Sequence, residues 1–127
     1  MEKLFRYIVV ISTVLFVFLH ILPFIDHMWL TEKELDLAAY DAWGANLPTN
    51  IYFYWGNLSV WVTIFIGLFF YIPVSRTAFV IMLVLTSIAS FFYGFSVLPA
   101  ISATVGNIVT MTDGALLVML YLTSVSR

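Results

Sequence analysis

The chain has 127 residues, of which 63% are hydrophobic, 9% are charged and none is cysteine. A soluble domain carries about 25% charged residues, and a chain this short has too little interior to bury so many apolar side chains, so the composition favours an integral membrane protein. The lack of cysteine excludes disulfides, thiolate metal sites and cysteine nucleophiles, and the net charge of −2 is too small for its sign to indicate a partner.

The apolar residues fall into four stretches, each close to the roughly 20 residues that a membrane-spanning helix needs. The first stretch is longer than the apolar core of a signal peptide and has no small-residue cleavage pattern, so we expect it to be retained. All four are apolar on every face, which favours helices over the alternating strands of a β-barrel. The predicted spans are Tyr7–Ile25, Ile51–Tyr71, Ala78–Leu98 and Val105–Leu122, with an uncharged linker over residues 99–104.

The basic residues indicate the orientation of these spans, because Lys and Arg concentrate in cytoplasmic loops. With four spans, Lys3, Arg6, Arg76 and Arg127 all fall on one side and only Lys33 falls on the other. The pattern predicts a multi-pass membrane protein with both termini in the cytoplasm. The fold class is therefore an all-α, four-helix membrane bundle.

The longest loop, Asp26–Asn50, is predicted to face outward and to be acidic. Thr31 and Glu34 form a capping-box pattern, and apolar residues then recur at helical spacing as far as Gly44. We expect a short amphipathic helix on the outer surface. Its acidic side chains are either simply solvated or form a docking surface for a basic partner; these residues are Glu32, Glu34, Asp36 and Asp41.

Small residues recur every four positions along three of the spans, a pattern typical of close helix packing in membranes. The stripes predict that the second, third and fourth helices pack closely, and that the first span, which has no stripe, packs more loosely. The stripes are Ser59, Thr63 and Gly67; Thr86, Ser90 and Gly94; and Gly106, Thr110 and Gly114.

Asp113 is the one acidic residue inside a span, and it lies near the middle of that span. A charged group there costs about 2.5–3.5 kcal/mol, so such residues usually mark functional sites. At 1.5 Å of rise per residue, three other polar residues lie within about 9 Å of the outer ends of their spans. They are His20, Asn57 and Tyr93, and Asn107 and Thr110 extend the polar track outward from Asp113.

We hypothesise that these six residues form an outward-open polar cleft with Asp113 at its floor. Asp113 would then contact a ligand or partner, carry a proton, or only join helices through hydrogen bonds to neighbouring polar side chains. The sequence leaves these three alternatives open. Asp113→Asn separates them, because hydrogen bonding tolerates the amide and proton carriage does not.

No set of residues indicates an enzyme, a cofactor or nucleic-acid binding. The chain has no nucleophile with an obvious base, no glycine-rich phosphate loop and no basic patch. His20 and His27 are the only histidines, and neither has ligand spacing that predicts a metal site. We therefore expect a non-enzymatic protein without a metal or cofactor.

The fourth span, from Thr112 to Thr123, resembles the closing segment of small four-span bacterial inner-membrane proteins of unassigned function. The layout of four spans and short turns also resembles immunity proteins that protect bacteria from pore-forming toxins. These resemblances, with the cleft and the acidic loop, favour a membrane-embedded accessory protein that binds a protein partner, a lipid or an amphiphile. The alternative is a small proton-coupled transporter that uses Asp113 and functions as a homo-oligomer.

Overall fold

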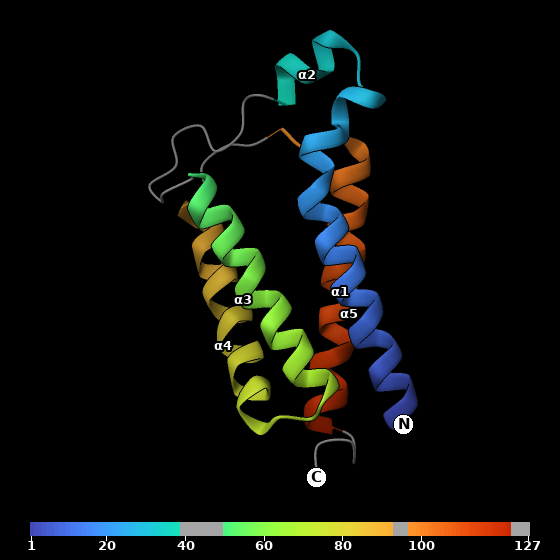
Figure 1. The fold of residues 1–127 in the computed structure, drawn as a ribbon, viewed down its shortest axis with the longest axis vertical. Coiled ribbons are helices and arrows are strands. Elements are labelled where there is room, and N and C mark those ends of the chain that lie inside the picture. The colour runs from blue at the N-terminus through green and yellow to red at the C-terminus, as the bar shows by residue number, and fades with distance from the viewer. Residues whose placement is uncertain (39–49, 93–96, 123–127) are drawn as a thin grey trace.

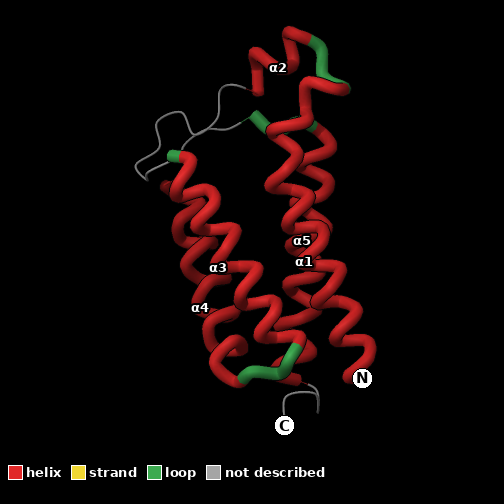
Figure 2. The backbone as a smooth tube through the Cα atoms, in the orientation of Figure 1, coloured by secondary structure: helices red, strands yellow, loops and turns green. Residues whose placement is uncertain are grey.

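The computed structural model describes residues 1–38, 50–92 and 97–122, and this part of the chain is helical apart from short turns (Figure 2). Four of the helical segments are long and apolar enough to cross a membrane. The elements are α1 (Glu2–Ile25), the 3₁₀ turn η1 (Asp26–Met28), α2 (Glu32–Ala38), α3 (Ile51–Phe69), α4 (Pro73–Ala89), the 3₁₀ turn η2 (Ser90–Phe92) and α5 (Ala100–Leu122).

The long helices form two antiparallel pairs (Figure 1). One pair joins α1 and α5, and the other is the hairpin of α3 and α4. The main apolar contact between the pairs lies at the end of the molecule that carries Glu2 and Leu122, here called the terminal end. α1 also contacts α3 nearer the other end, where the Tyr54 hydroxyl donates to the His20 carbonyl (2.6 Å). The short helix α2 lies at the opposite end, here called the α2 end.

The helix boundaries differ from the predicted spans, most of all around α4 and at the start of α5. α4 begins at Pro73, because proline suits the first turn of a helix, and the residues described after Phe92 are not helical as far as Pro99. The residue before a proline is disfavoured in helical conformation, which accounts for the break at Leu98. The predicted linker 99–104 is wrong from Ala100 onward, since α5 begins there and Ala103 N–H donates to the Pro99 carbonyl (2.9 Å).

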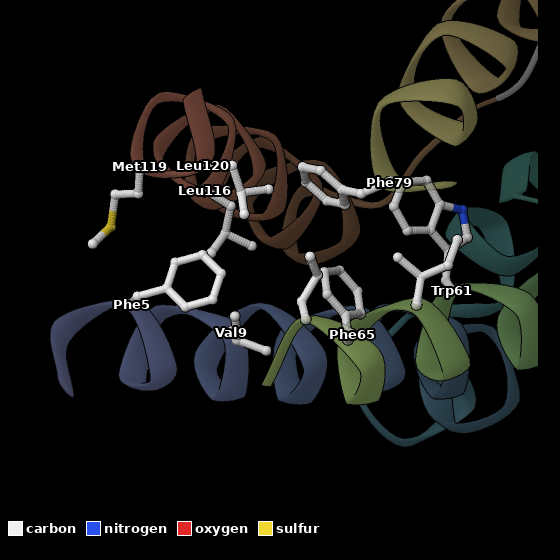
Figure 3. Close-up of a cluster of buried hydrophobic side chains, with 10 residues drawn as sticks. Phe5, Val9, Trp61, Phe65, Phe79, Leu116, Met119 and Leu120 are labelled. Carbon is white, nitrogen blue, oxygen red and sulfur yellow. The ribbon is translucent and has the colours of Figure 1, made fainter. Parts of the chain in front are cut away.

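A buried apolar cluster fills the terminal end and contains residues from all four long helices (Figure 3). Phe5 of α1 points toward Leu116 of α5, and Phe79 of α4 packs against Trp61 and Phe65 of α3 at ring-centroid distances of 6.0 and 6.2 Å. A second, smaller cluster joins α1 to α5 nearer the α2 end. It consists of Leu22, Val105 and Val109.

Polar contacts also hold the helix ends together at the terminal end. The Tyr71 hydroxyl donates to the Glu2 carbonyl (3.2 Å), and the Arg6 guanidinium lies over the Tyr71 ring at 5.1 Å. Arg76 of α4 donates to the Leu120 carbonyl of α5 (3.2 Å). These contacts place Arg6 and Arg76 at the same end of the molecule.

The prediction that the first span packs loosely is wrong, because α1 contacts both α5 and α3 and carries buried residues along its whole length. The packing predicted from the small-residue stripes holds for α3 and α4 but not for α5, which packs mainly against α1, and Gly94 lies outside the described residues. Ser59 and Thr63 are exposed and donate to carbonyls of their own helix, and side-chain space at Gly114 is open. Bulky residues of α1 interlock with α5 without needing small ones.

Gly67 is the exception among the small residues of the stripes. A Cβ atom at this position would overlap the Ser75 hydroxyl, and it would lie 2.7 Å from the Ser75 Cβ. The Gly67 carbonyl also accepts a hydrogen bond from Ile72 N–H (2.8 Å) in the tight α3–α4 turn, where Tyr71 has a φ of 57°. The absence of a side chain at position 67 lets α4 begin directly against α3.

Candidate functional site

A cavity of about 900 Å³ lies between α1, α3 and α5 and extends to the α2 end of the molecule. Its walls are mainly apolar, with Leu19 of α1, Val109 of α5 and Leu35 of α2 among them. Pockets of about 300–1,000 Å³ are typical of small-molecule sites, and these are usually apolar with a few polar groups. The polar residues that line this cavity are His20, Asp26, Tyr54, Ser102, Asn107 and Thr110.

The structure therefore brings three of the predicted site residues together. His20 of α1 lies across the cavity from Asn107 and Thr110 of α5, because α1 and α5 are antiparallel neighbours. The Thr110 hydroxyl donates to the Gly106 carbonyl of its own helix (3.0 Å). Asn107 is exposed and its amide is open to a ligand.

His20 is held in place by two neighbouring residues. Its Nδ1 atom is 3.0 Å from the Phe16 carbonyl oxygen, and because a carbonyl only accepts, Nδ1 carries the proton. The Tyr54 hydroxyl of α3 donates to the His20 carbonyl (2.6 Å), and the two rings lie 4.9 Å apart. The Tyr54 contact joins α3 to α1 at the cavity wall, and the Nδ1–Phe16 hydrogen bond orients the imidazole.

The other three predicted residues do not line the cavity. Asn57 is half-buried on α3, and Tyr93 lies outside the described residues. Asp113 is 9% exposed, one helical turn beyond Thr110 and closer to the terminal end. No described residue hydrogen-bonds to its Oδ1 atom.

Ser12 of α1 lies at the same level as Asp113. Phe5 of α1 and Leu120 of α5 belong to one cluster. Ser12 lies seven residues after Phe5, and Asp113 lies seven residues before Leu120, so on antiparallel helices both lie the same distance from that cluster. Seven residues are about two turns, so both side chains return to the α1–α5 interface. The Ser12 hydroxyl is fully buried and also has no partner among the described residues. The interface thus contains two buried polar groups just beyond the cavity.

Sequence reasoning missed three cavity residues: Asp26, Tyr54 and Ser102. Asp26 was assigned to the solvated loop, but it lies in η1 and is only 6% exposed. Ser102 was assigned to the linker, although α5 has already begun there. Tyr54 lies within the predicted span Ile51–Tyr71, but no sequence pattern indicated that its side chain faces the cavity.

The predicted acidic surface is only partly within the described residues. Glu32, Glu34 and Asp36 are exposed on α2, whereas Asp41 and the predicted continuation of the helix to Gly44 lie outside them. Leu35 and Ala38, on another face of α2, line the cavity. α2 therefore covers one side of the cavity mouth and exposes acidic groups.

The Glu34 half of the predicted capping box is present at the start of α2. The Thr31 backbone N–H and hydroxyl both donate to the Glu34 carboxylate, at 2.8 and 2.7 Å. These two hydrogen bonds hold the pKa of Glu34 below its ordinary value. Nowhere in the described part of the chain do three His, Asp or Glu side chains lie close enough together to hold a metal ion.

No family model, curated protein or solved structure matches the chain. The geometry alone therefore defines the class: a helical protein with four helices able to cross a membrane and a largely apolar cavity between three of them. A binding site is the kind of site that such a cavity forms.

Proposed function

We propose that the protein is a non-enzymatic, membrane-embedded binding or accessory protein that takes an amphiphile into the cavity between α1, α3 and α5. The observation that carries this proposal is the cavity itself, which combines apolar walls with polar groups from α1, η1, α3 and α5. An amphiphile matches such a surface, because its chain covers the apolar walls and its head group meets the polar ones.

The proposed orientation places the termini in the cytoplasm and the α2 end outside a bacterial inner membrane. Arg6 and Arg76 lie at the terminal end, and Lys3 belongs to the same first turns of α1. Basic residues of short loops favour the cytoplasmic side, which supports this assignment. The cavity mouth then faces the extracytoplasmic surface.

The acidic face of α2 is proposed to attract a basic protein partner or a cationic amphiphile to the cavity mouth. Glu32, Glu34 and Asp36 are exposed there and outnumber Lys33. Protection against a basic, membrane-inserting toxin is one specific form of this function. Reversing two of these charges, as in Glu32→Lys with Asp36→Lys, should weaken capture of such a partner and leave the cavity unchanged.

A pair of glycine variants tests the cavity directly. Gly106 lines the cavity and Gly114 does not, yet both lie on α5 and a Cβ at either position would meet no atom within 4 Å. Gly106→Phe should therefore obstruct the cavity, and Gly114→Phe is the matched control. Native mass spectrometry of gently extracted protein should find a bound amphiphile in the wild type and in Gly114→Phe but not in Gly106→Phe. Equal retention by both variants, or no bound amphiphile in the wild type, would contradict the proposal.

A proton-coupled transporter is the second candidate function, and the buried polar groups Ser12 and Asp113 favour it. They lie between the cavity and the terminal end, where a translocation path would have to continue. Asp113→Asn should abolish pH-driven flux in liposomes if Asp113 carries a proton. If Asp113→Asn folds stably and its flux is unchanged, the transporter proposal is contradicted, and Asp113 only joins α1 to α5.

A further inference from the structure

The cavity contains one acidic side chain that is buried without a partner. Asp26 lies in η1, directly after α1, and lines the cavity. It is 6% exposed, and its Oδ1 atom accepts no hydrogen bond from any residue that the structure describes. A buried carboxylate oxygen without a donor costs free energy, so such a group in a cavity indicates a missing partner.

His20, a second polar residue of the cavity, also offers a hydrogen-bond acceptor. Since Nδ1 of His20 donates to the Phe16 carbonyl, the Nε2 atom of the neutral ring is the acceptor. No hydrogen bond joins Nε2 to another described residue. His20 and Asp26 both line the cavity, one on the last turns of α1 and the other immediately after it.

The charge of the cavity is not balanced by a basic residue. None of the described residues that line it is Lys or Arg, and Lys33 is exposed on α2 outside the lining. An anionic head group would therefore face the Asp26 carboxylate with no cation to oppose the repulsion. A cationic head group with N–H donors would instead pair with Asp26 and hydrogen-bond to acceptors such as His20 Nε2.

We propose that the cavity selects amphiphiles whose head group is a protonated amine, with Asp26 as the residue that pairs with the ammonium. This inference rests on the proposed function, since it names the ligand class of the same cavity. The ammonium would lie near η1, and the alkyl chain would follow Leu19 and Val109 along the apolar walls. The acidic face of α2 has the charge that attracts such a ligand to the mouth.

The test measures binding of radiolabelled dodecylamine to the full-length protein in phosphatidylcholine nanodiscs, with empty nanodiscs subtracted. Dodecanoate is the anionic ligand with the same chain length. Asp26→Asn removes the charge in the cavity. Glu2→Gln is the matched control, because Glu2 is exposed at the terminal end and belongs neither to the cavity nor to the acidic face of α2. Circular dichroism and thermal unfolding of each variant establish that the fold is retained.

Asp26→Asn should weaken dodecylamine binding by tenfold or more, whereas Glu2→Gln should bind as the wild type does. The wild type should bind dodecylamine more tightly than dodecanoate. Competition by lysophosphatidylethanolamine would identify a lipid head group as the source of the amine, and competition by free alkylamines alone would identify a free amphiphile; either result supports the amine class.

The assignment is overturned if Asp26→Asn binds dodecylamine like the wild type, or if dodecanoate binds at least as tightly. Gly106→Phe separates this failure from failure of the proposed function. Dodecanoate binding that Gly106→Phe abolishes would leave the cavity as a ligand site with a different head-group preference. Binding of both ligands that Gly106→Phe does not change would remove the cavity as a binding site.

Discussion

Replacing Gly67 with alanine is expected to destabilise the protein, although the same change in an open helix position is usually favourable. The new Cβ would lie 2.7 Å from the Ser75 Cβ, whereas carbon atoms in contact are normally about 3.5–4.0 Å apart. Rotating the serine hydroxyl does not relieve this contact, because the Cβ moves only with the backbone. α4 must therefore shift by about 1 Å relative to α3.

The size of the effect follows from two opposing contributions. Alanine is better than glycine inside a helix by up to about 1 kcal/mol, and overpacking of a tight contact costs about 1–3 kcal/mol. Gly114→Ala gains the first contribution without the second, since its surroundings are open. We expect Gly67→Ala to be less stable than Gly114→Ala by about 1–3 kcal/mol.

Unfolding of the purified protein in mixed micelles, followed by circular dichroism, measures this difference. Ser75→Gly in the Gly67→Ala background removes both overlapping atoms and should restore most of the lost stability. The reasoning is refuted if Gly67→Ala is as stable as Gly114→Ala, or if Ser75→Gly gives no recovery.

Two further predictions concern the ends of the molecule. Phe79→Ala should destabilise the protein by about 2–3 kcal/mol, which is below the 3–5 kcal/mol typical of cores in water because lipid supplies no hydrophobic drive between helices. Ile81→Ala, at an exposed position, should change the stability little. Equal unfolding midpoints for the two variants would contradict the role of Phe79 in joining the helix pairs. Since the pKa of Glu34 is lowered, its cap should support α2 above the ordinary pKa of 4.5 and be lost as the pH falls through the lowered pKa. The protection factor of the Thr31 amide, which compares its exchange rate with that of an unstructured peptide at the same pH, should therefore fall on acidification. Glu34→Gln should remove most of that pH dependence, and the same fall in Glu34→Gln would contradict the cap.

The four membrane-length helices could be predicted from the sequence, because each is a nearly uninterrupted apolar run and helices satisfy their own backbone hydrogen bonds. The capping box of α2 could be predicted as well, since Thr31 and Glu34 interact locally. Both predictions depend on residues close together in the chain.

The pairing of the helices could not be predicted in the same way. Small-residue stripes indicated contacts among the last three spans, but bulky side chains such as Phe5 and Leu116 set the α1–α5 interface. In a chain with 63% hydrophobic residues, almost every face of a helix is apolar, so periodicity does not single out the face that packs.

The candidate site was predicted only in part, because it too depends on which helix faces pack together. His20 was predicted in the outer half of its span, and Asn107 and Thr110 on the outward side of Asp113. The antiparallel neighbours α1 and α5 bring these three residues to one cavity. Asp26 and Ser102 were missed because their burial depends on where η1 and the start of α5 pack, and no local pattern encodes that contact.

The most direct test of the central proposal uses the absence of cysteine from the chain. Ser102→Cys introduces a single thiol on the cavity wall, and Ser12→Cys introduces one in the closed α1–α5 interface. A water-soluble thiol reagent should modify position 102 rapidly and position 12 slowly, and dodecylamine should protect position 102. Equal, slow modification at both positions, or no protection by any amphiphile, would contradict a ligand-binding cavity that opens at the α2 end.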